Sequence, residues 1–286
     1  MRYAVVGGDR RAALLAEELQ REGNLVHSWA LEKAELPAGI PRDLSLQSCT
    51  YGADCVILPT PAEKGGLLYA PLGLESPSME EVVGALWPGS LVIGGRFSGE
   101  TVTQALRAKL RIEDVMRRPD FVTGNAAITA EGALELLLRE SERTLLYSRC
   151  LVTGWGRIGK QLALRLAALG ASVTVAARGR ADRAEAEALG LRALDYEQLE
   201  GAVGELDYLV NTVPARVLTD ALLCCLPGEA LLLELASPPG GFDPMLAKNV
   251  GLRVLHAPGL PGKSAPRSAA RLLRRTIAQV MAEQED

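Results

Sequence analysis

Short apolar runs alternate along the chain with longer stretches in which apolar residues recur at helical spacing. This alternation is typical of α/β proteins, because strands that pair in parallel need a crossover connection that is usually a helix. In the first part of the chain it predicts strands at 3–6, 25–29, 55–58 and 91–93, and helices at 11–22, 79–86 and 101–109. The periodicity breaks between 117 and 129. A helix over 130–142, capped by Thr129, is then expected to bridge two domains.

A second series of strands follows this bridge. The expected strands lie at 150–153, 172–176, 192–194, 208–211, 230–235 and 252–256. Six strands with intervening helices are the count of a complete dinucleotide-binding fold. We therefore predict an α/β protein with two Rossmann-like parallel-sheet domains, the second a full NAD(P)-binding Rossmann domain. Their expected bounds are 1–128, closed by a C-terminal helix over 266–286 that Ser264 can cap, and 129–265.

The turn after the strand at 150–153 carries a glycine motif. It has the pattern G-x-G-x-x-G, formed by Gly154, Trp155, Gly156, Arg157, Ile158 and Gly159. The first glycine permits a tight turn, the second lets the backbone approach a pyrophosphate, and the third lets the helix lie close to the strand. The helix start then offers N–H groups and a partial positive charge to the anion. An ordinary glycine-rich turn can have the same sequence pattern. The expected strand before this motif and the expected helix after it favour a dinucleotide site.

The end of the next strand distinguishes the two nicotinamide cofactors. An NAD enzyme usually carries an acid there for the ribose 2′-hydroxyl, whereas this chain has Arg178, with Arg180 and Arg183 close behind. A guanidinium offers a fork of donors and a fixed charge to a 2′-phosphate. We therefore predict NADP in preference to NAD, although solvated surface arginines would have the same pattern.

Two further loops are expected near the nicotinamide, because ligands in open α/β sheets lie at the carboxyl ends of the strands. The residues concerned are Asn211, Thr212, Val213, Pro214, Ala236 and Ser237. Both segments are equally compatible with plain turns, since Asn, Ser, Pro and Gly are common turn formers.

Composition narrows the class of protein. An apolar fraction of 48% with 23% charged residues is ordinary for a soluble globular protein, and a net charge of −4 argues against a basic nucleic-acid-binding face. No apolar stretch reaches the roughly 20 residues of a membrane span, and the N-terminal run is too short for a signal peptide. Five cysteines without a Cys-x-x-Cys pair, and only His27 and His256, argue against a zinc site. We expect a cytoplasmic protein with reduced thiols and no metal.

The turn at Gly7 and Gly8 also lies between an expected strand and an expected helix. It lacks the third glycine at the required spacing, so we do not interpret it as a second dinucleotide site. It is either a small anion site at a helix start or a turn in which Asp9 caps the helix.

Several polar residues are candidates for contacts with a substrate. Arg10 and Arg96 follow strands, and Lys263 lies in a loop after the sixth strand of the second series, so all three could bind carboxylates. Lys263 could also transfer a proton, as could Glu131, and Asn125 could orient the substrate. An exposed lysine and a glutamate that favours a helix dipole are the simpler alternatives.

Some of these pieces form a wider pattern. The chain resembles the A-subunit family of dipicolinate synthase from spore-forming bacteria. The segments that carry the resemblance are 8–10 (GDR), 125–132 (NAAITAEG), 154–159 (GWGRIG), 174–178 (TVAAR) and 260–266 (LPGKSAP). The third is common to many dehydrogenases, whereas the second and the last are more specific.

The resemblance implies a partner, a substrate and a reaction. A member of this family would work in a homo- or hetero-oligomer with a flavoprotein-like B subunit during sporulation. Together they would convert dihydrodipicolinate, or its hydrated precursor on a branch of the lysine pathway, into pyridine-2,6-dicarboxylate. A dicarboxylate needs at least two cationic or amide anchors, which Arg10, Arg96, Asn125 and Lys263 could supply.

Two other functions stay open on the sequence. One is a different two-domain NAD(P)-dependent dehydrogenase, with the layout of alanine, methylenetetrahydrofolate or shikimate dehydrogenase. The other is a module that binds a dinucleotide without turnover, because no clear acid–base pair is present in the sequence.

Overall fold

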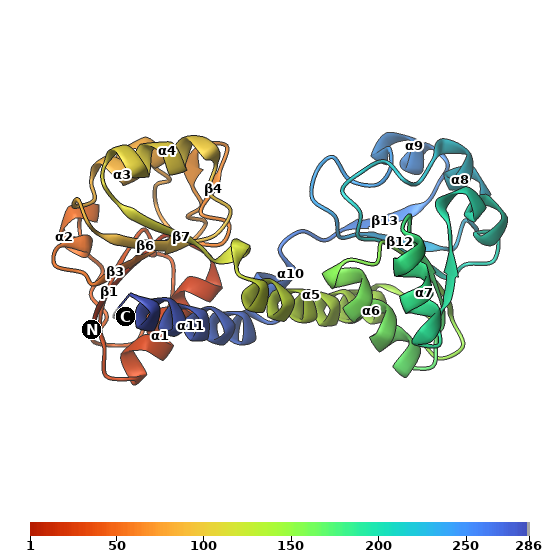
Figure 1. Cartoon of the computed structure of the whole chain (residues 1–286), viewed down its shortest axis with the longest axis horizontal. Coiled ribbons are helices and arrows are strands. Elements are labelled where there is room, and N and C mark those ends of the chain that lie inside the picture. Colours follow the sequence, from red (N-terminus) through yellow and green to blue (C-terminus); the bar gives the residue numbers. More distant parts are fainter. Residues whose placement is uncertain (285–286) are drawn as a thin grey trace. The chain divides into compact units, whose positions relative to one another are not determined.

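The computed structural model describes residues 1–284, which form two compact units (Figure 1). The first contains Met1–Asn125 and the segment from Ala265 onward, and the second contains Ala126–Ser264. No helix among the described residues is both long enough and apolar enough to span a bilayer.

The first unit is built on a five-stranded parallel sheet. In spatial order its strands are β2 (Leu25–Trp29), β1 (Arg2–Val6), β3 (Cys55–Ile57), β6 (Leu91–Gly94) and β7 (Arg111–Asp114). β1 pairs with β2 on one side and β3 on the other, so the strand order reverses between β1 and β3. The carboxyl ends of these two strands therefore flank a topological switch point, where open α/β sheets bind ligands.

Helices cover both faces of this sheet (Figure 1). They are α1 (Arg10–Arg21), α2 (Leu46–Thr50), α3 (Met79–Gly84), α4 (Gly99–Arg107) and α11 (Pro266–Glu283), with a 3₁₀ turn η1 (Val115–Arg117) and a small hairpin of β4 (Glu63–Lys64) and β5 (Leu67–Leu68). α1 packs against α11. Its apolar positions recur at helical spacing, and Leu15 and Leu19 are buried on the face toward the core.

The second unit contains a six-stranded parallel sheet. In spatial order the strands are β10 (Arg192–Leu194), β9 (Ser172–Ala176), β8 (Arg149–Thr153), β11 (Tyr208–Asn211), β12 (Leu231–Glu234) and β13 (Arg253–His256). This is the strand order of a complete dinucleotide-binding fold, with its switch point between β8 and β11. The predicted fold class is confirmed, because both units are parallel α/β sheets and the second has all six strands.

Helices again form layers on both faces of the second sheet. The elements are the part of α5 (Pro119–Glu140) from Ala126 onward, α6 (Arg157–Ala168), α7 (Arg180–Ala188), α8 (Asp220–Cys225), α9 (Pro244–Asn249), α10 (Leu260–Lys263), η2 (Tyr196–Gln198) and η3 (Glu200–Ala202). One core layer joins α5, α6 and α7 to the sheet, and its largest buried side chains include Leu137, Leu162 and Leu166. The other joins α8 and α9 to the opposite face through Leu222 and Ala247.

The helix expected to begin at Ala130, with Thr129 as its cap, begins eleven residues earlier. α5 starts at Pro119 and continues without a break, so Thr129 is an interior, buried residue and not a cap. The prediction from local helix propensity was wrong for the first residues of α5, because tertiary packing decides the conformation of this segment. A Cβ atom at Gly124 would lie 2.8 Å from Leu272 Cδ1 of α11. Gly124, although a poor helix former, is therefore the residue that lets α5 and α11 approach each other.

Other elements also differ from the expectation. β7, α2 and the β4–β5 hairpin were not predicted, because they are short or carry mostly polar residues. The loop expected at 259–263 contains the helical turn α10. Ser264 does not cap the last helix, since the N-cap is Ala265 and the Ser264 hydroxyl lies 3.4 Å from Glu135 Oε2.

The cysteines lie mostly in the core. Cys49, Cys55 and Cys150 are buried, whereas Cys224 and Cys225 are exposed. Burial raises the pKa of the Cys150 thiol to about 11 and that of Cys55 to about 12. These two thiols are therefore structural rather than nucleophilic at neutral pH.

The position of α5 in the second unit can be tested with two neighbouring leucines. Leu137 is fully buried, whereas Leu138 is 51% exposed. We expect Leu137→Ala to lower the free energy of unfolding by about 2–5 kcal/mol, because it leaves a cavity in the core. Leu138→Ala should change it by less than about 1 kcal/mol. Urea titration of both variants checks this, and equal losses would contradict the assigned helix face.

Candidate functional site

The turn between β8 and α6 has the backbone that the glycine motif predicts. Gly154 has φ +95°, a conformation that favours glycine. A Cβ atom at Gly159 would overlap with the carbonyl oxygen of Gly154, so this position fixes the close packing of helix on strand. A Cβ atom at Gly156 would meet no atom within 4 Å. The space beside Gly156 is therefore open, as a site for an approaching pyrophosphate requires.

The start of α6 fits an anion. Its N-cap is Gly156, which has no side chain to accept from the first N–H groups, and no acidic residue lies in the first turn. The first N–H groups of a helix have no partner within the helix and carry its positive dipole end. Arg157 adds an exposed cation at the same point. The residues present thus fit the phosphates of a dinucleotide.

Trp155 holds this turn against the next helix. Its indole Nε1 donates to Glu185 Oε2 of α7 at 3.0 Å. Lys160 Nζ lies 2.6 Å from the same oxygen and 5.6 Å from the centroid of the Trp155 ring. Hydrogen bonds from Lys160 and then Trp155 lower the pKa of Glu185. The three side chains fix the position of the turn without capping the N–H groups at the start of α6.

Arg178 and Arg183 have different surroundings at the end of β9. Arg178 is exposed directly after the strand, where the ribose 2′ position lies in this fold. Arg183 Nη1 donates to the carbonyl oxygens of Ala177 and Arg178 at 2.7 and 2.8 Å, and to Asp195 at 2.5 Å. Arg183 therefore shapes the turn that carries Arg178.

The loops after β11 and β12 are joined by a buried polar network. Asn211 Nδ2 donates to Glu234 Oε1 at 2.7 Å and to the Val213 carbonyl at 3.0 Å. Its Oδ1 accepts from Thr153 Oγ1 at 2.6 Å. Thr212 Oγ1 donates to the Thr153 carbonyl at 2.7 Å, directly under the glycine turn. Asn211 thus positions the loop from within the fold.

Glu234 is the centre of this network and was not recognised in the sequence. Its side chain is almost fully buried and also accepts from the backbone N–H groups of Ala236 and Gly241, each at 2.8 Å. A Cβ atom at Gly241 would overlap with Asn211, so the segment folds back closely over the strand ends. The carboxylate therefore fixes the start and the end of the loop that carries Ala236 and Ser237. Its placement at the end of an apolar strand was the available signal.

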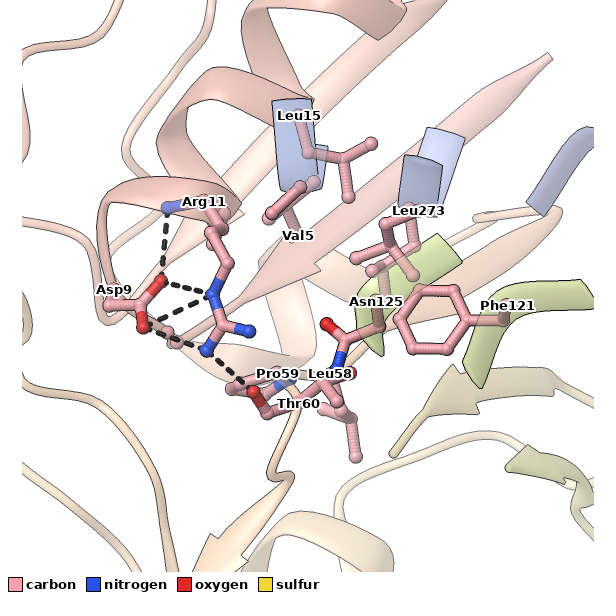
Figure 2. Close-up of a pocket in the computed structure, with 15 residues that line it drawn as sticks. Val5, Asp9, Arg11, Leu15, Leu58, Pro59, Thr60, Phe121, Asn125 and Leu273 are labelled. Carbon is pink, nitrogen blue, oxygen red and sulfur yellow. Dashed lines mark hydrogen bonds and ion pairs between the residues drawn. The ribbon is translucent and has the colours of Figure 1, made fainter. Parts of the chain in front are cut away.

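The first unit has a largely apolar pocket with a few polar side chains at its own switch point (Figure 2). The N–H groups of Gly7 and Gly8 donate to the carbonyl oxygens of Trp29 and Tyr69, so they hold the turn rather than offer an anion site. Asp9 caps α1 by accepting from Arg11 N at 3.0 Å. Of the two alternatives for this turn, the structure therefore shows the capped helix.

The predicted substrate-binding cations lie at exposed positions. Arg10 is the first residue of α1 and Arg96 follows β6, both exposed in the first unit. The Arg96 backbone N–H donates to Asp114 Oδ1 at 3.0 Å. Asn125 lines the pocket at the switch point, whereas Arg10 and Arg96 do not. Arg11 does line it, and this residue was overlooked in the sequence.

The remaining candidates belong to the second unit. Lys263 is exposed at the end of α10, and Glu131 is exposed on α5 with Arg165 Nη2 3.5 Å from its carboxylate. His256 ends β13, with its ring centroid 6.1 Å from that of Phe242.

These features define the class of the second unit, an NAD-binding domain of the dehydrogenase type. Residues 138–224 match the family described as the NAD-binding domain of D-isomer-specific 2-hydroxyacid dehydrogenases. Residues 2–116 match the family described as the N-terminal domain of the dipicolinate synthase A subunit. A domain of the first kind implies a nicotinamide dinucleotide cofactor.

The similarity to one protein extends over nearly the whole chain. The A subunit of dipicolinate synthase from Bacillus subtilis is 29% identical over 286 residues, covering 99% of this chain and 96% of that protein. Its crystal structure superposes with a TM-score of 0.85 at 28% identity and the same coverage. The structure of the Bacillus halodurans protein gives 0.87 at 25% identity, covering 98% and 97%. The resemblance inferred from the sequence is therefore confirmed.

The Glu234 network gives a second prediction. Glu234→Ala leaves three N–H donors without their acceptor, those of Asn211, Gly241 and the partly buried Ala236. Each such buried group costs about 1–3 kcal/mol. We expect the free energy of unfolding to fall by about 3 kcal/mol and amide exchange at Ala236 and Gly241 to accelerate. Glu229→Ala removes a carboxylate that is 81% exposed and should cost less than about 1 kcal/mol. Urea titration and hydrogen exchange measure both, and unchanged exchange at the two amides would refute the assigned role.

Proposed function

We propose that this chain is the NADP-linked oxidoreductase subunit of a dipicolinate synthase. With a flavoprotein-like B subunit it would convert dihydrodipicolinate, or its hydrated precursor, into pyridine-2,6-dicarboxylate in the cytoplasm of a sporulating cell. The observation that carries the proposal is the similarity to the A subunit of dipicolinate synthase over 99% of the chain. The retained phosphate turn of the second unit supports it.

The second unit would hold the cofactor with its own backbone and one cation. The N–H groups at the start of α6 bind the phosphates, and the open space at Gly156 admits them. Arg178 binds the 2′-phosphate of NADP. The bound nicotinamide supplies the acceptor for a hydride that leaves a ring carbon of the substrate. Asn211 and Glu234 keep the two nearby loops in place.

The substrate would be held by cations and an amide. A dicarboxylate requires at least two anchors, and Arg10, Arg96, Asn125 and Lys263 are the proposed ones. Aromatisation of the dihydropyridine also releases a ring proton, for which Lys263 and Glu131 are the proposed acceptors. Arg165 near Glu131 would hold that carboxylate in one orientation.

Calorimetric titration of NADP, with and without pyridine-2,6-dicarboxylate, tests the proposal. We expect NADP to bind and its affinity to rise when the dicarboxylate is present, because the proposed reaction requires both ligands to be bound together. Addition of dihydrodipicolinate and NADP should generate reduced nicotinamide absorbance, measured with and without the flavoprotein-like partner. Absence of NADP binding, or of turnover with that partner present, would refute the assignment.

Arg178 decides the choice of cofactor in this proposal. We expect Arg178→Ala to weaken NADP binding about 10- to 100-fold, since a hydrogen bond to a charged group contributes about 1.5–3 kcal/mol. NAD binding should change little, because it lacks the 2′-phosphate. Arg192→Ala is the matched control, an exposed arginine at the opposite end of the neighbouring strand β10. Equal losses for NADP and NAD would contradict the role.

A further inference from the structure

The pocket of the first unit lies where its sheet should bind a ligand. It is lined by the turn after β1, by Leu58, Pro59 and Thr60 after β3, and by side chains of α1, α5 and α11. The strand order reverses between β1 and β3, so two loops diverge at this point and leave a crevice. The location follows from the topology and does not depend on the glycine motif of the second unit.

Arg11 is held in this pocket by its neighbours (Figure 2). Its Nε donates to Asp9 Oδ1 at 2.9 Å and its Nη2 to Asp9 Oδ2 at 2.8 Å. Nη2 also donates to the carbonyl oxygen of Thr60 at 2.6 Å. The side chain is only 15% exposed. These bonds fix the plane of the guanidinium, and Figure 2 shows Nη1 pointing away from Asp9.

Thr60 adds a buried hydroxyl to the same pocket. Its Oγ1 is buried and has no hydrogen-bond partner among residues 1–284. The hydroxyl lies against the backbone of Gly95, where a Cβ atom would be only 2.8 Å away. An unsatisfied buried hydroxyl destabilises a fold, so this hydroxyl would gain a hydrogen bond from a ligand that reached it.

The apolar lining and the small volume of the pocket limit which part of a ligand can enter it. Val5, Leu15, Phe121 and Leu273 make the upper part apolar, and Asn125 lies across the pocket from Arg11 (Figure 2). The cavity measures about 20 Å³, and about 10–15 Å³ already holds one water. It therefore admits the end group of a ligand and not a whole ring.

We infer that Arg11, oriented by Asp9, anchors one carboxylate group of the substrate in this pocket, with Thr60 Oγ1 as the second donor. The inference rests on the proposed function for the identity of the acid. A carboxylate accepts from a guanidinium and a hydroxyl and has no hydrogen to donate, so this donor set prefers it to an amide. The Asp9–Arg11 pair is neutral, so the pocket carries no uncompensated charge before the ligand arrives.

The experiment measures binding of three probes to the full chain by calorimetry, with and without saturating NADP. The probes are pyridine-2,6-dicarboxylate, pyridine-2-carboxylate and the uncharged pyridine-2,6-dicarboxamide. We expect both acids to bind the wild-type chain more tightly than the diamide. Arg11→Ala should weaken pyridine-2,6-dicarboxylate at least 10-fold and leave NADP affinity unchanged. Arg21→Ala, at the exposed far end of α1, should leave both affinities within twofold.

Thr60→Val keeps the test valid if Arg11→Ala fails to fold. It removes a hydroxyl that has no partner in the unbound pocket, so thermal stability should be equal or higher. Binding of the dicarboxylate should nevertheless fall several-fold. A purely structural role for Thr60 would give the reverse, with lower stability and unchanged binding.

The outcomes separate this inference from the proposed function. Wild-type binding that Arg11→Ala leaves unchanged would overturn the inference and leave the proposed function intact. Equal affinity for the diamide and the acids would also overturn it, as would failure of every acid to bind. NADP binding and turnover, measured on the same preparations, decide the proposed function independently.

Discussion

The contact between Gly159 and the carbonyl oxygen of Gly154 determines the geometry of the second unit. With no Cβ atom at this point, the first turn of α6 lies directly on the end of β8, the central strand of the sheet. The uncapped N–H groups of the helix then face the edge at which all parallel strands end. The loops next to this junction are held by hydrogen bonds of Trp155, Asn211 and Glu234.

The two units share a strand–turn–helix topology, but the turn after the first strand differs between them. In the second unit the Gly154 N–H of the turn donates to the Ala176 carbonyl, but the start of α6 has no capping side chain. In the first unit the turn binds its own backbone groups and caps its helix with Asp9, so only a side chain is left to contact a ligand. A backbone anion site suits a cofactor common to many proteins, whereas a side-chain donor such as Arg11 is easily changed between substrates.

The sequence was sufficient to predict the central strands, because they are continuous apolar runs buried on both faces, as β8 and β11 show. It could not predict β7, an edge strand with the polar sequence RIED. It also failed for the first half of α5, where Gly124 opposes helix formation locally but permits the packing of α11. For the site, the glycine pattern predicted the backbone geometry of the turn after β8, because its spacing follows from backbone sterics. Arg10 was named from the sequence and not Arg11, the arginine that lines the pocket. One signal was available, since Arg11 precedes Leu15 and Leu19 at intervals of four and so lies on the buried face of α1.

The glycines of the phosphate turn are retained for different reasons, and this has an evolutionary consequence. A side chain at Gly159 would disrupt the fold, so folding alone preserves that residue. A side chain at Gly156 would extend into open space, so only a bound ligand opposes it. A duplicated gene released from selection for the cofactor would therefore keep Gly159 and lose Gly156 by drift. Both glycines are present in this chain, as expected of one that binds a dinucleotide.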